Sequence, residues 1–207
     1  MIKKEIYPKT KRVSCTGDKV CITEKLDGSN LVFFKKNDKL YFAQRNNIIC
    51  IDEIEEQKNM LYKGLYQWLL DNNGVLESEL HENSAICGEW LGMGQLKYNI
   101  DDFDKRWYMF AKANIDDEFN LYNLNYDHSL FIYPFISQEI PKFMGIVPEV
   151  AELNVIPTKE HLDSLYEKYC NKEKRNVEGF VVNYKNMITK YVRMKNGKLR
   201  EHFDRGE

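Results

Sequence analysis

Apolar and polar residues alternate in several short runs of the first third of the chain, which is typical of β-strands with one buried face. These runs cover residues 19–24, 31–35 and 40–45. The second and third runs are separated by a short polar connection that contains Asn37-Asp38. Asn and Asp tolerate the left-handed conformation of tight turns, so this pair predicts a β-hairpin.

Helical spacing replaces the alternation after the third run. Apolar residues recur at positions that one face of a helix would bring together: Ile54, Leu61, Leu65, Trp68 and Leu69. Asp52 before them is a candidate N-cap, and Gly74 would follow the end of this long helix. A second helix is predicted over 159–169, with Thr158 as its cap.

The remaining apolar runs are short and have strand character: 85–91, 106–111, 179–184 and 188–194. Many short strands with about two helices predict an α+β fold with an antiparallel core. With 207 residues, of which 43% are hydrophobic, the chain is large enough for one substantial globular domain. We therefore expect a single domain over residues 1–207.

Composition and charge exclude several classes of protein. Thirty basic and 32 acidic residues give a formal charge of −2, which excludes a uniformly basic nucleic-acid binder but allows a local basic patch. The longest apolar stretch, 130–136, is far too short to cross a bilayer, and no apolar segment follows the charged N-terminus. Five scattered cysteines without C-x-x-C spacing favour reduced thiols, so we expect a cytoplasmic protein.

The chemistry is concentrated around residues 24–30, Glu-Lys-Leu-Asp-Gly-Ser-Asn. Lys25 follows a predicted strand and precedes a tight turn, which makes it a candidate nucleophile. A lysine amine, with its ordinary pKa of about 10.4, needs desolvation or nearby positive charge to lose its proton. Asp-Gly-Ser-Asn is also common turn composition, so the segment alone slightly favours an exposed loop.

The stretch around Lys25 resembles motif I (K-x-D-G) of the covalent nucleotidyltransferases, which include ATP-dependent DNA ligases, RNA ligases and mRNA capping enzymes. Further motifs of that superfamily follow in order: Arg45 in motif Ia, Glu89 in motif III, Phe110 in motif IIIa, Glu178 in motif IV, and Arg193 with Lys195 in motif V. The K-x-D-G-S-N form, followed by G-E-W-x-G at 88–92, is most similar to the RNA ligase branch. Six weak motifs in the expected order make a specific pattern.

Two positions depart from that pattern. Arg193 stands where motif V usually has a lysine, which keeps the charge but changes the donor geometry. Motif IIIa commonly continues with an aspartate, whereas Ala111 and Lys112 follow Phe110. Phe110 remains the candidate for stacking on the base, with Tyr108 in reserve.

The resemblance implies a nucleotidyltransferase domain of antiparallel sheets flanked by a few helices, with an ATP cleft between the sheets. It also implies an ATP-dependent RNA ligase in which Lys25 forms a lysyl-AMP intermediate. AMP then passes to an RNA 5′-phosphate, and a 3′-hydroxyl displaces it. Arg193 and Lys195 would neutralise phosphate charge, and Glu178 would be the carboxylate beside a Mg²⁺ or Mn²⁺ ion.

The same resemblance implies a set of nucleotide-binding residues. Glu89 would hold the ribose hydroxyls, Phe110 would stack on the base, and Arg45 would hold a phosphate. Glu24 and Asn30, on either side of the lysine motif, complete the set. Without the motif order, Glu89 would be interpreted as a solvated strand residue and Phe110 as a core residue.

Strand alternation gives a separate prediction for motif V. In the run 188–194 and its continuation, Arg193 and Lys195 share one face, whereas Lys190 shares the other. We therefore expect Lys190 to point away from the phosphates. By the same rule, Glu178 should share a face with Phe180.

Three alternative functions use the same motifs. A DNA ligase and a GTP-dependent mRNA guanylyltransferase share the lysine chemistry, but both usually carry an OB-fold domain, and 12 residues follow Lys195. A catalytically inactive nucleotide- or RNA-binding module is the third. We expect no appended C-terminal OB-fold or helical domain, and weak RNA binding that a partner protein or self-paired RNA ends would support. Repair and processing of RNA both fit these motifs.

Overall fold

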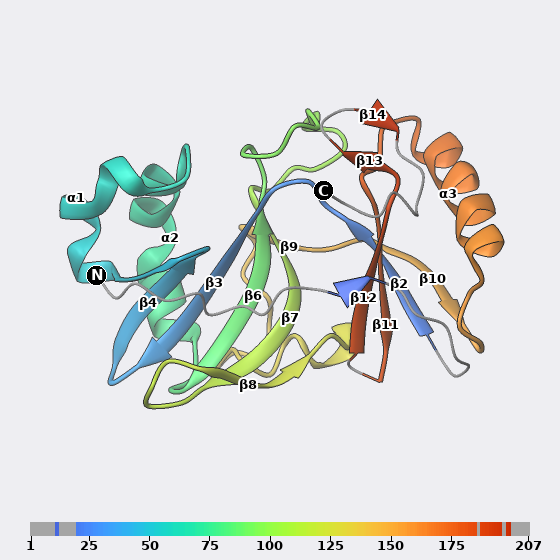
Figure 1. The fold of residues 1–207 in the computed structure, drawn as a ribbon. Coiled ribbons are helices and arrows are strands. Elements are labelled where there is room, and N and C mark those ends of the chain that lie inside the picture. The colour runs from blue at the N-terminus through green and yellow to red at the C-terminus, as the bar shows by residue number, and fades with distance from the viewer. Residues whose placement is uncertain (1–10, 13–19, 186, 196–197, 200–207) are drawn as a thin grey trace. The chain divides into compact units, whose positions relative to one another are not determined.

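The computed structural model describes residues 11–12, 20–185, 187–195 and 198–199, and these residues form two compact units. Of the described residues, unit 1 contains Gly28–Gly94 and Tyr98–Ile146, and unit 2 contains the others. Each unit is built on its own, mainly antiparallel, sheet (Figure 1). The α+β class predicted from the alternation is confirmed.

The sheet of unit 1 has seven strands in the order β5-β4-β3-β6-β7-β8, with the short β9 beside β7. They are β3 (Ser29–Lys36), β4 (Lys39–Gln44), β5 (Asn47–Cys50), β6 (Ser84–Trp90), β7 (Trp107–Ile115), β8 (Leu121–Asn125) and β9 (Met144–Ile146). All pairs are antiparallel except β7 with β9. The predicted strands at 31–35, 40–45, 85–91 and 106–111 all belong to this sheet.

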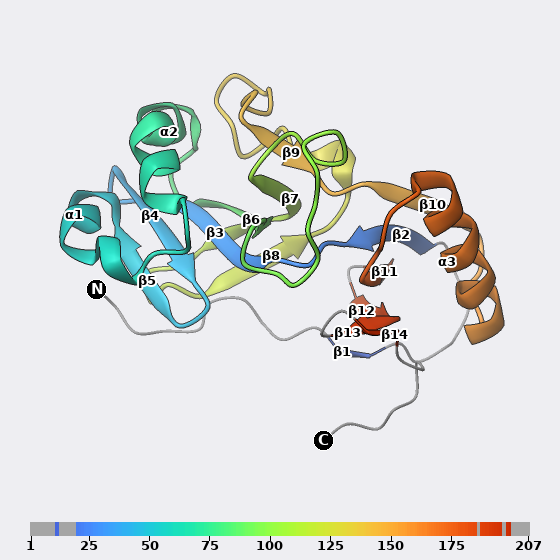
Figure 2. The ribbon, with the colours of Figure 1, turned by 90° about the horizontal axis from the view of Figure 1, so that it is seen from above.

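One face of this sheet is covered by helical segments (Figure 1 and Figure 2). They are η1 (Ile51–Glu53), α1 (Ile54–Gln57), η2 (Lys58–Met60) and α2 (Leu65–Glu79), and a further short helix, η3 (His128–Leu130), follows β8. Leu65, Leu69 and Leu76 of α2 are buried in one apolar core with the sheet. The single long helix predicted from the spacing is wrong, because Gly64, at φ +80°, begins α2 after an irregular segment. Gly74 lies inside α2.

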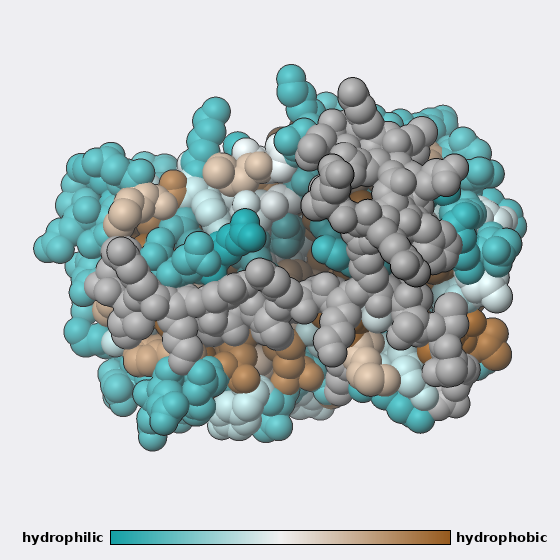
Figure 3. Space-filling model, in the orientation of Figure 1, coloured by the Kyte–Doolittle hydropathy of each residue, from teal (hydrophilic) through white to brown (hydrophobic). Residues whose placement is uncertain are grey.

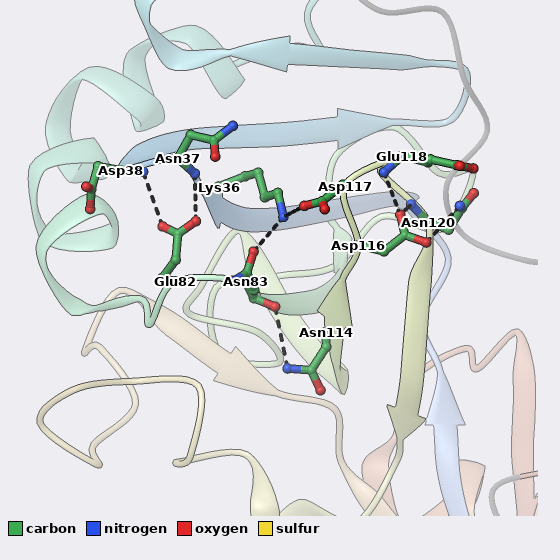
Figure 4. Close-up of polar contacts among 10 residues, drawn as sticks. All are labelled: Lys36, Asn37, Asp38, Glu82, Asn83, Asn114, Asp116, Asp117, Glu118 and Asn120. Atoms are coloured by element: carbon green, nitrogen blue, oxygen red, sulfur yellow. Dashed lines mark hydrogen bonds and ion pairs between the residues drawn. The ribbon is translucent and has the colours of Figure 1, made fainter.

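A network of polar contacts stabilises the β3–β4 turn (Figure 4). Asn37 and Asp38 have φ of 51° and 57°, and both backbone N–H groups donate to the Glu82 carboxylate, at 2.6 and 3.2 Å. The Lys36 ammonium donates to Asn83 Oδ1 at 2.8 Å and to Asp117 Oδ1 at 2.5 Å. The predicted hairpin is thus confirmed, and these polar groups bind one another at the end of β3 opposite Asn30.

The sheet of unit 2 has the strand order β1-β12-β11-β2-β10. Its strands are β1 (Lys11–Arg12), β2 (Val20–Lys25), β10 (Glu149–Leu153), β11 (Gly179–Tyr184) and β12 (Met187–Val192). A separate two-stranded ribbon joins β13 (Met194–Lys195) to β14 (Lys198–Leu199). The predicted strands at 19–24, 179–184 and 188–194 belong to this unit.

Helix α3 (Lys159–Glu173) covers one face of the unit 2 sheet. The Thr158 hydroxyl accepts a hydrogen bond from the His161 N–H, so the predicted cap is confirmed. Ile22 and Phe180 from neighbouring strands pack with the helix in one buried cluster. The part of α3 visible in Figure 3 is mostly hydrophilic. Among the described residues, no helix has the length and apolarity needed to cross a membrane.

Candidate active site

Lys25 and Glu178 meet in unit 2. Lys25 is the last residue of β2, where it pairs with Gly179, and Glu178 immediately precedes β11. Lys25 Nζ lies 2.5 Å from Glu178 Oε2, and the two side chains are 25% and 17% exposed. The structure therefore brings the expected nucleophile and the expected metal-binding carboxylate into direct contact.

Gly179 explains how the glutamate reaches the lysine. A Cβ atom on Gly179 would lie 2.0 Å from the Tyr191 carbonyl oxygen, so no other residue fits without moving β12. The Glu178 carbonyl accepts hydrogen bonds from the N–H groups of Arg193, at 2.9 Å, and Met194, at 3.0 Å. The expectation that Glu178 shares a face with Phe180 is wrong, because β11 begins only after Glu178 and Phe180 packs under α3.

The surroundings of Glu178 shift its acidity. Burial raises the pKa of Glu178 above 4.5, and the charge and hydrogen bond of Lys25 partly oppose this effect. The charge of Lys190 also lowers that pKa. A carboxylate of raised pKa in contact with an amine can orient the amine and accept its proton.

Asp27 anchors a loop beside the lysine. One oxygen, Oδ2, accepts the backbone N–H groups of Gln95 and Leu96, both at 2.6 Å. Gly28 is required at the next position, because a Cβ there would lie 2.4 Å from the Trp90 carbonyl oxygen. The Asp-Gly step of the lysine motif is therefore built for close backbone packing, which excludes the exposed-loop alternative.

Motif V differs from its prediction. The Arg193 guanidinium lies 2.7 Å from Asp163 Oδ1 and 5.5 Å from the centre of the Tyr166 ring, both on α3. Arg193 thus faces the helix side of the sheet. Lys195 ends β13, and its side chain lies outside the described residues. The roles of both residues in phosphate binding stay predictions.

Lys190 lies on the face that carries Lys25. Lys190 pairs with Val181, and Val181 pairs with Thr23, two residues before Lys25 on β2. Directly paired residues share a face, and so do residues two apart. The expectation that Lys190 points away is therefore wrong. Lys190 and Arg193 do lie on opposite faces, as alternation predicts, but α3 covers the face of Arg193 and Lys25 lies on the face of Lys190.

Glu24 has a different position from the one implied by the resemblance. Its side chain is fully buried on the α3 side of β2, where Arg175 Nη1 and Nη2 donate to its two oxygens at 2.5 and 2.6 Å. The Tyr169 hydroxyl donates to the same carboxylate at 2.8 Å. The Glu24 carboxylate is directed away from the face of Lys25, so the expected nucleotide contact from this side chain is not supported.

Unit 1 holds the remaining predicted residues at one end of its sheet. Asn30 of β3 pairs with Glu89 of β6, and Glu89 pairs with Tyr108 of β7, so the three share the face opposite α2. Phe110 occupies a β-bulge between the pairs Cys87–Ala111 and Gly88–Met109, and it is half-buried. Bulges redirect side chains next to functional sites.

Tyr62 packs partly against the unit 1 core and also contacts two predicted site residues, which the helical spacing does not predict. It lies before α2, and its hydroxyl donates to the Asn30 carbonyl and accepts the Arg45 N–H, each at 3.2 Å. Burial raises the pKa of Tyr62, as does the charge of Glu89. One feature of the sequence indicates that Tyr62 lies outside the helix: Gly64, two residues later, is a residue type that interrupts helices.

Glu178 is the carboxylate in contact with Lys25 and is the candidate metal ligand. Among the residues that the structure describes, no group of three or more His, Cys, Asp or Glu side chains could hold a metal ion. Mg²⁺ often uses one or two carboxylates together with substrate phosphates and water. Glu178, with its partly desolvated oxygens, fits that manner of binding.

Solved structures share this fold. An archaeal ATP-dependent RNA ligase has a TM-score of 0.53 and 15% identity, over 90% of this chain and 48% of that one. A putative ATP-dependent DNA ligase from Aquifex aeolicus has a TM-score of 0.51 and 18% identity, over 90% and 49%. A variant of a Naegleria gruberi RNA ligase with AMP and Mn has a TM-score of 0.50 and 18% identity, over 92% and 56%. The chain spans about half the length of these proteins.

These structures, at 15–18% identity, show that the chain shares the fold of ATP-dependent RNA and DNA ligases. The family model described as RNA ligase matches residues 18–197. The chain therefore belongs to the RNA ligase family. A search of curated protein sequences finds no match.

Proposed function

We propose that this chain is an ATP-dependent RNA ligase that works through a lysyl-AMP intermediate. The contact between Lys25 and Glu178, within a member of the RNA ligase family, is the observation that carries the proposal. Lys25 is partly desolvated at a strand end, and Glu178 lies where it can orient the amine and accept the proton that the amine must lose before it attacks.

The first step forms a bond between Lys25 Nζ and the α-phosphorus of ATP, and breaks the bond to pyrophosphate. The amine loses a proton in this step, and Glu178 is the carboxylate in contact to receive it. In the second step, an RNA 5′-phosphate oxygen attacks the same phosphorus and Lys25 leaves. In the third, a 3′-hydroxyl attacks the RNA phosphorus and AMP leaves.

Unit 1 supplies the nucleotide contacts in this proposal. Glu89 holds the ribose hydroxyls, Arg45 holds a phosphate, and Phe110 stacks on the base. Two features support these roles: Asn30 and Glu89 pair directly across β3 and β6, and Tyr62 links the backbones of Asn30 and Arg45. In unit 2, Lys190 lies on the face of Lys25 and is a candidate cation for the phosphates beside Lys195, whereas Arg193 is bound to Asp163 on the α3 side.

A Mg²⁺ or Mn²⁺ ion completes the proposal. Glu178 would hold it together with the phosphates, and the bound ion would neutralise charge on the reacting phosphate and the leaving pyrophosphate.

The test is a labelling experiment. The chain is incubated with α-³²P-ATP and magnesium and analysed by denaturing electrophoresis, with α-³²P-GTP in a parallel reaction. We expect an acid-labile protein label from ATP that is absent in Lys25→Ala and present in Lys172→Ala, a variant of an exposed lysine on α3. A label from GTP alone would indicate a guanylyltransferase, and a label that persists in Lys25→Ala would exclude this nucleophile.

A second assay separates the steps. Lys25→Ala should fail to join 5′-phosphate RNA with ATP, yet should join a strand that is supplied already adenylated, because the lysine has no covalent role in the last step. The same assay with DNA strands distinguishes an RNA ligase from a DNA ligase. Loss of both joining reactions in Lys25→Ala would contradict this division.

A further inference from the structure

A buried ion pair lies behind the proposed nucleophile. Glu24 and Arg175 are 151 residues apart in sequence, and Arg175 Nη1 and Nη2 donate to Glu24 Oε1 and Oε2 respectively. The Glu24 side chain is 0% exposed and that of Arg175 is 10% exposed. A bidentate pair of this kind fixes both distance and orientation.

The segment 175–178 holds β2 from both faces. Arg175 binds Glu24 on the α3 side, and three residues later Glu178 binds Lys25 on the other side. The segment is itself anchored, because the Val177 carbonyl accepts a 2.7 Å hydrogen bond from the buried Tyr166 hydroxyl. Two consecutive residues of β2 are thus fixed by one short segment.

Further contacts leave the strand end little freedom. The Tyr169 hydroxyl donates to the Glu24 carboxylate, and the Glu24 N–H donates to the Pro148 carbonyl at 2.9 Å. Neighbouring residues of a strand point to opposite faces, so a rotation of the strand at Glu24 would also turn the direction in which the Lys25 side chain leaves the backbone.

We propose that Arg175 is a positioning residue for Lys25, which acts through Glu24 to aim the amine at the α-phosphorus. This inference rests on the proposed lysyl-AMP chemistry. A misplacement of about 1 Å of a reacting group can reduce a rate about a hundredfold. The positioning of the amine matters in the two steps in which the lysine–phosphorus bond forms and breaks. It does not matter when RNA that is already adenylated is sealed.

The experiment compares two rates in each variant of the full chain: self-adenylation with ATP, and sealing of pre-adenylated nicked RNA. Arg175→Met should slow self-adenylation by about tenfold or more, with the KM for ATP and the sealing rate each within about threefold of wild type. Tyr169→Phe removes one bond to the same carboxylate and should slow self-adenylation about threefold. Arg175→Lys should fall between Arg175→Met and wild type, because lysine keeps the charge without the bidentate geometry.

Lys168→Met is the matched control, since it removes a positive charge from the exposed side of α3. It should leave both rates within about twofold. If Arg175→Met does not fold, Arg175→Lys and Tyr169→Phe decide the question.

Two results would overturn the inference: an equal loss of both rates, which indicates a purely structural ion pair, or wild-type self-adenylation in the Arg175 and Tyr169 variants. A wild-type chain that takes no label from ATP contradicts the proposed function instead, so the two failures are distinguishable.

Discussion

The position of Lys190 on the face of Lys25 gives the sharpest prediction about phosphate binding. The change is Lys190→Met, which removes the charge and keeps most of the side-chain volume. Lys190 of β12 is separated from Thr23 of β2 only by β11, and its charge already lowers the pKa of Glu178. A triphosphate that reacts with Lys25 would lie on the same face.

The magnitude follows from the strand spacing. Two neighbouring strand spacings place the Lys190 and Thr23 backbones about 10 Å apart. Unit charges about 10 Å apart interact by about 1.7 kcal/mol at an effective dielectric constant of about 20. Salt reduces this value, and about 1.4 kcal/mol corresponds to a tenfold change in rate. We therefore expect kcat/KM for self-adenylation to fall about tenfold in Lys190→Met.

The assay measures single-turnover self-adenylation over a range of ATP concentrations. Lys190→Arg should stay within about threefold of wild type because it keeps the charge. Lys168→Met, on the exposed side of α3, is the control for a general loss of charge. The fall should be smaller at high salt. Wild-type kcat/KM in Lys190→Met, or an equal fall in the control, would refute the assignment of Lys190 to the reactive face.

Two further predictions concern Tyr62 and Glu178. Tyr62→Phe removes the hydroxyl that links Asn30 to Arg45, so the KM for ATP should rise about three- to tenfold with little change in kcat. The control is Tyr66→Phe, because the Tyr66 hydroxyl donates to Glu55 instead. An unchanged KM in Tyr62→Phe would contradict the role of Tyr62. Because burial raises the pKa of Glu178 in the folded chain above 4.5, its stabilising contribution is complete below about pH 4.5 and is lost as pH rises through the raised value. In denaturant titrations, the unfolding free energy of wild type relative to Glu178→Gln should therefore fall over that window; a rise would contradict the sign of the shift.

The local sequence pattern was sufficient to predict many of the strands and one of the helices. Alternation predicted the strands that carry Lys25 and Glu89, and the Asn37-Asp38 connection predicted a hairpin that the structure confirms. The capped helix after Thr158 was also found, although α3 continues to Glu173. The prediction of one long helix was wrong because the apolar residues keep their helical spacing across a break in the helix. Gly64 lies at that break and caps the second segment, α2.

Alternation says which residues share a face, but it does not say which face another element covers. Residues 190 and 193 were correctly placed on opposite sides, and the packing of α3 then decided the outcome. That helix binds Arg193 through Asp163 and leaves Lys190 with Lys25. Arg175 could not be found from sequence either, because its partner Glu24 is 151 positions away and no local pattern links the two residues.

The ion pair that the segment 175–178 makes with β2 serves the orientation of the strand more than the stability of the fold. Burying the Glu24 carboxylate and the Arg175 guanidinium costs desolvation energy, and their mutual attraction often does no more than offset that cost. Well-packed apolar residues in both places would serve stability as well, but they would not fix the rotation of β2. A bidentate pair fixes the rotation of β2 before any nucleotide binds. The free energy needed to orient Lys25 is then not added to the activation barrier. On this argument, changes in the Arg175 contacts should reduce the rate of self-adenylation more than they reduce the affinity for ATP, a separation that simple destabilisation would not produce.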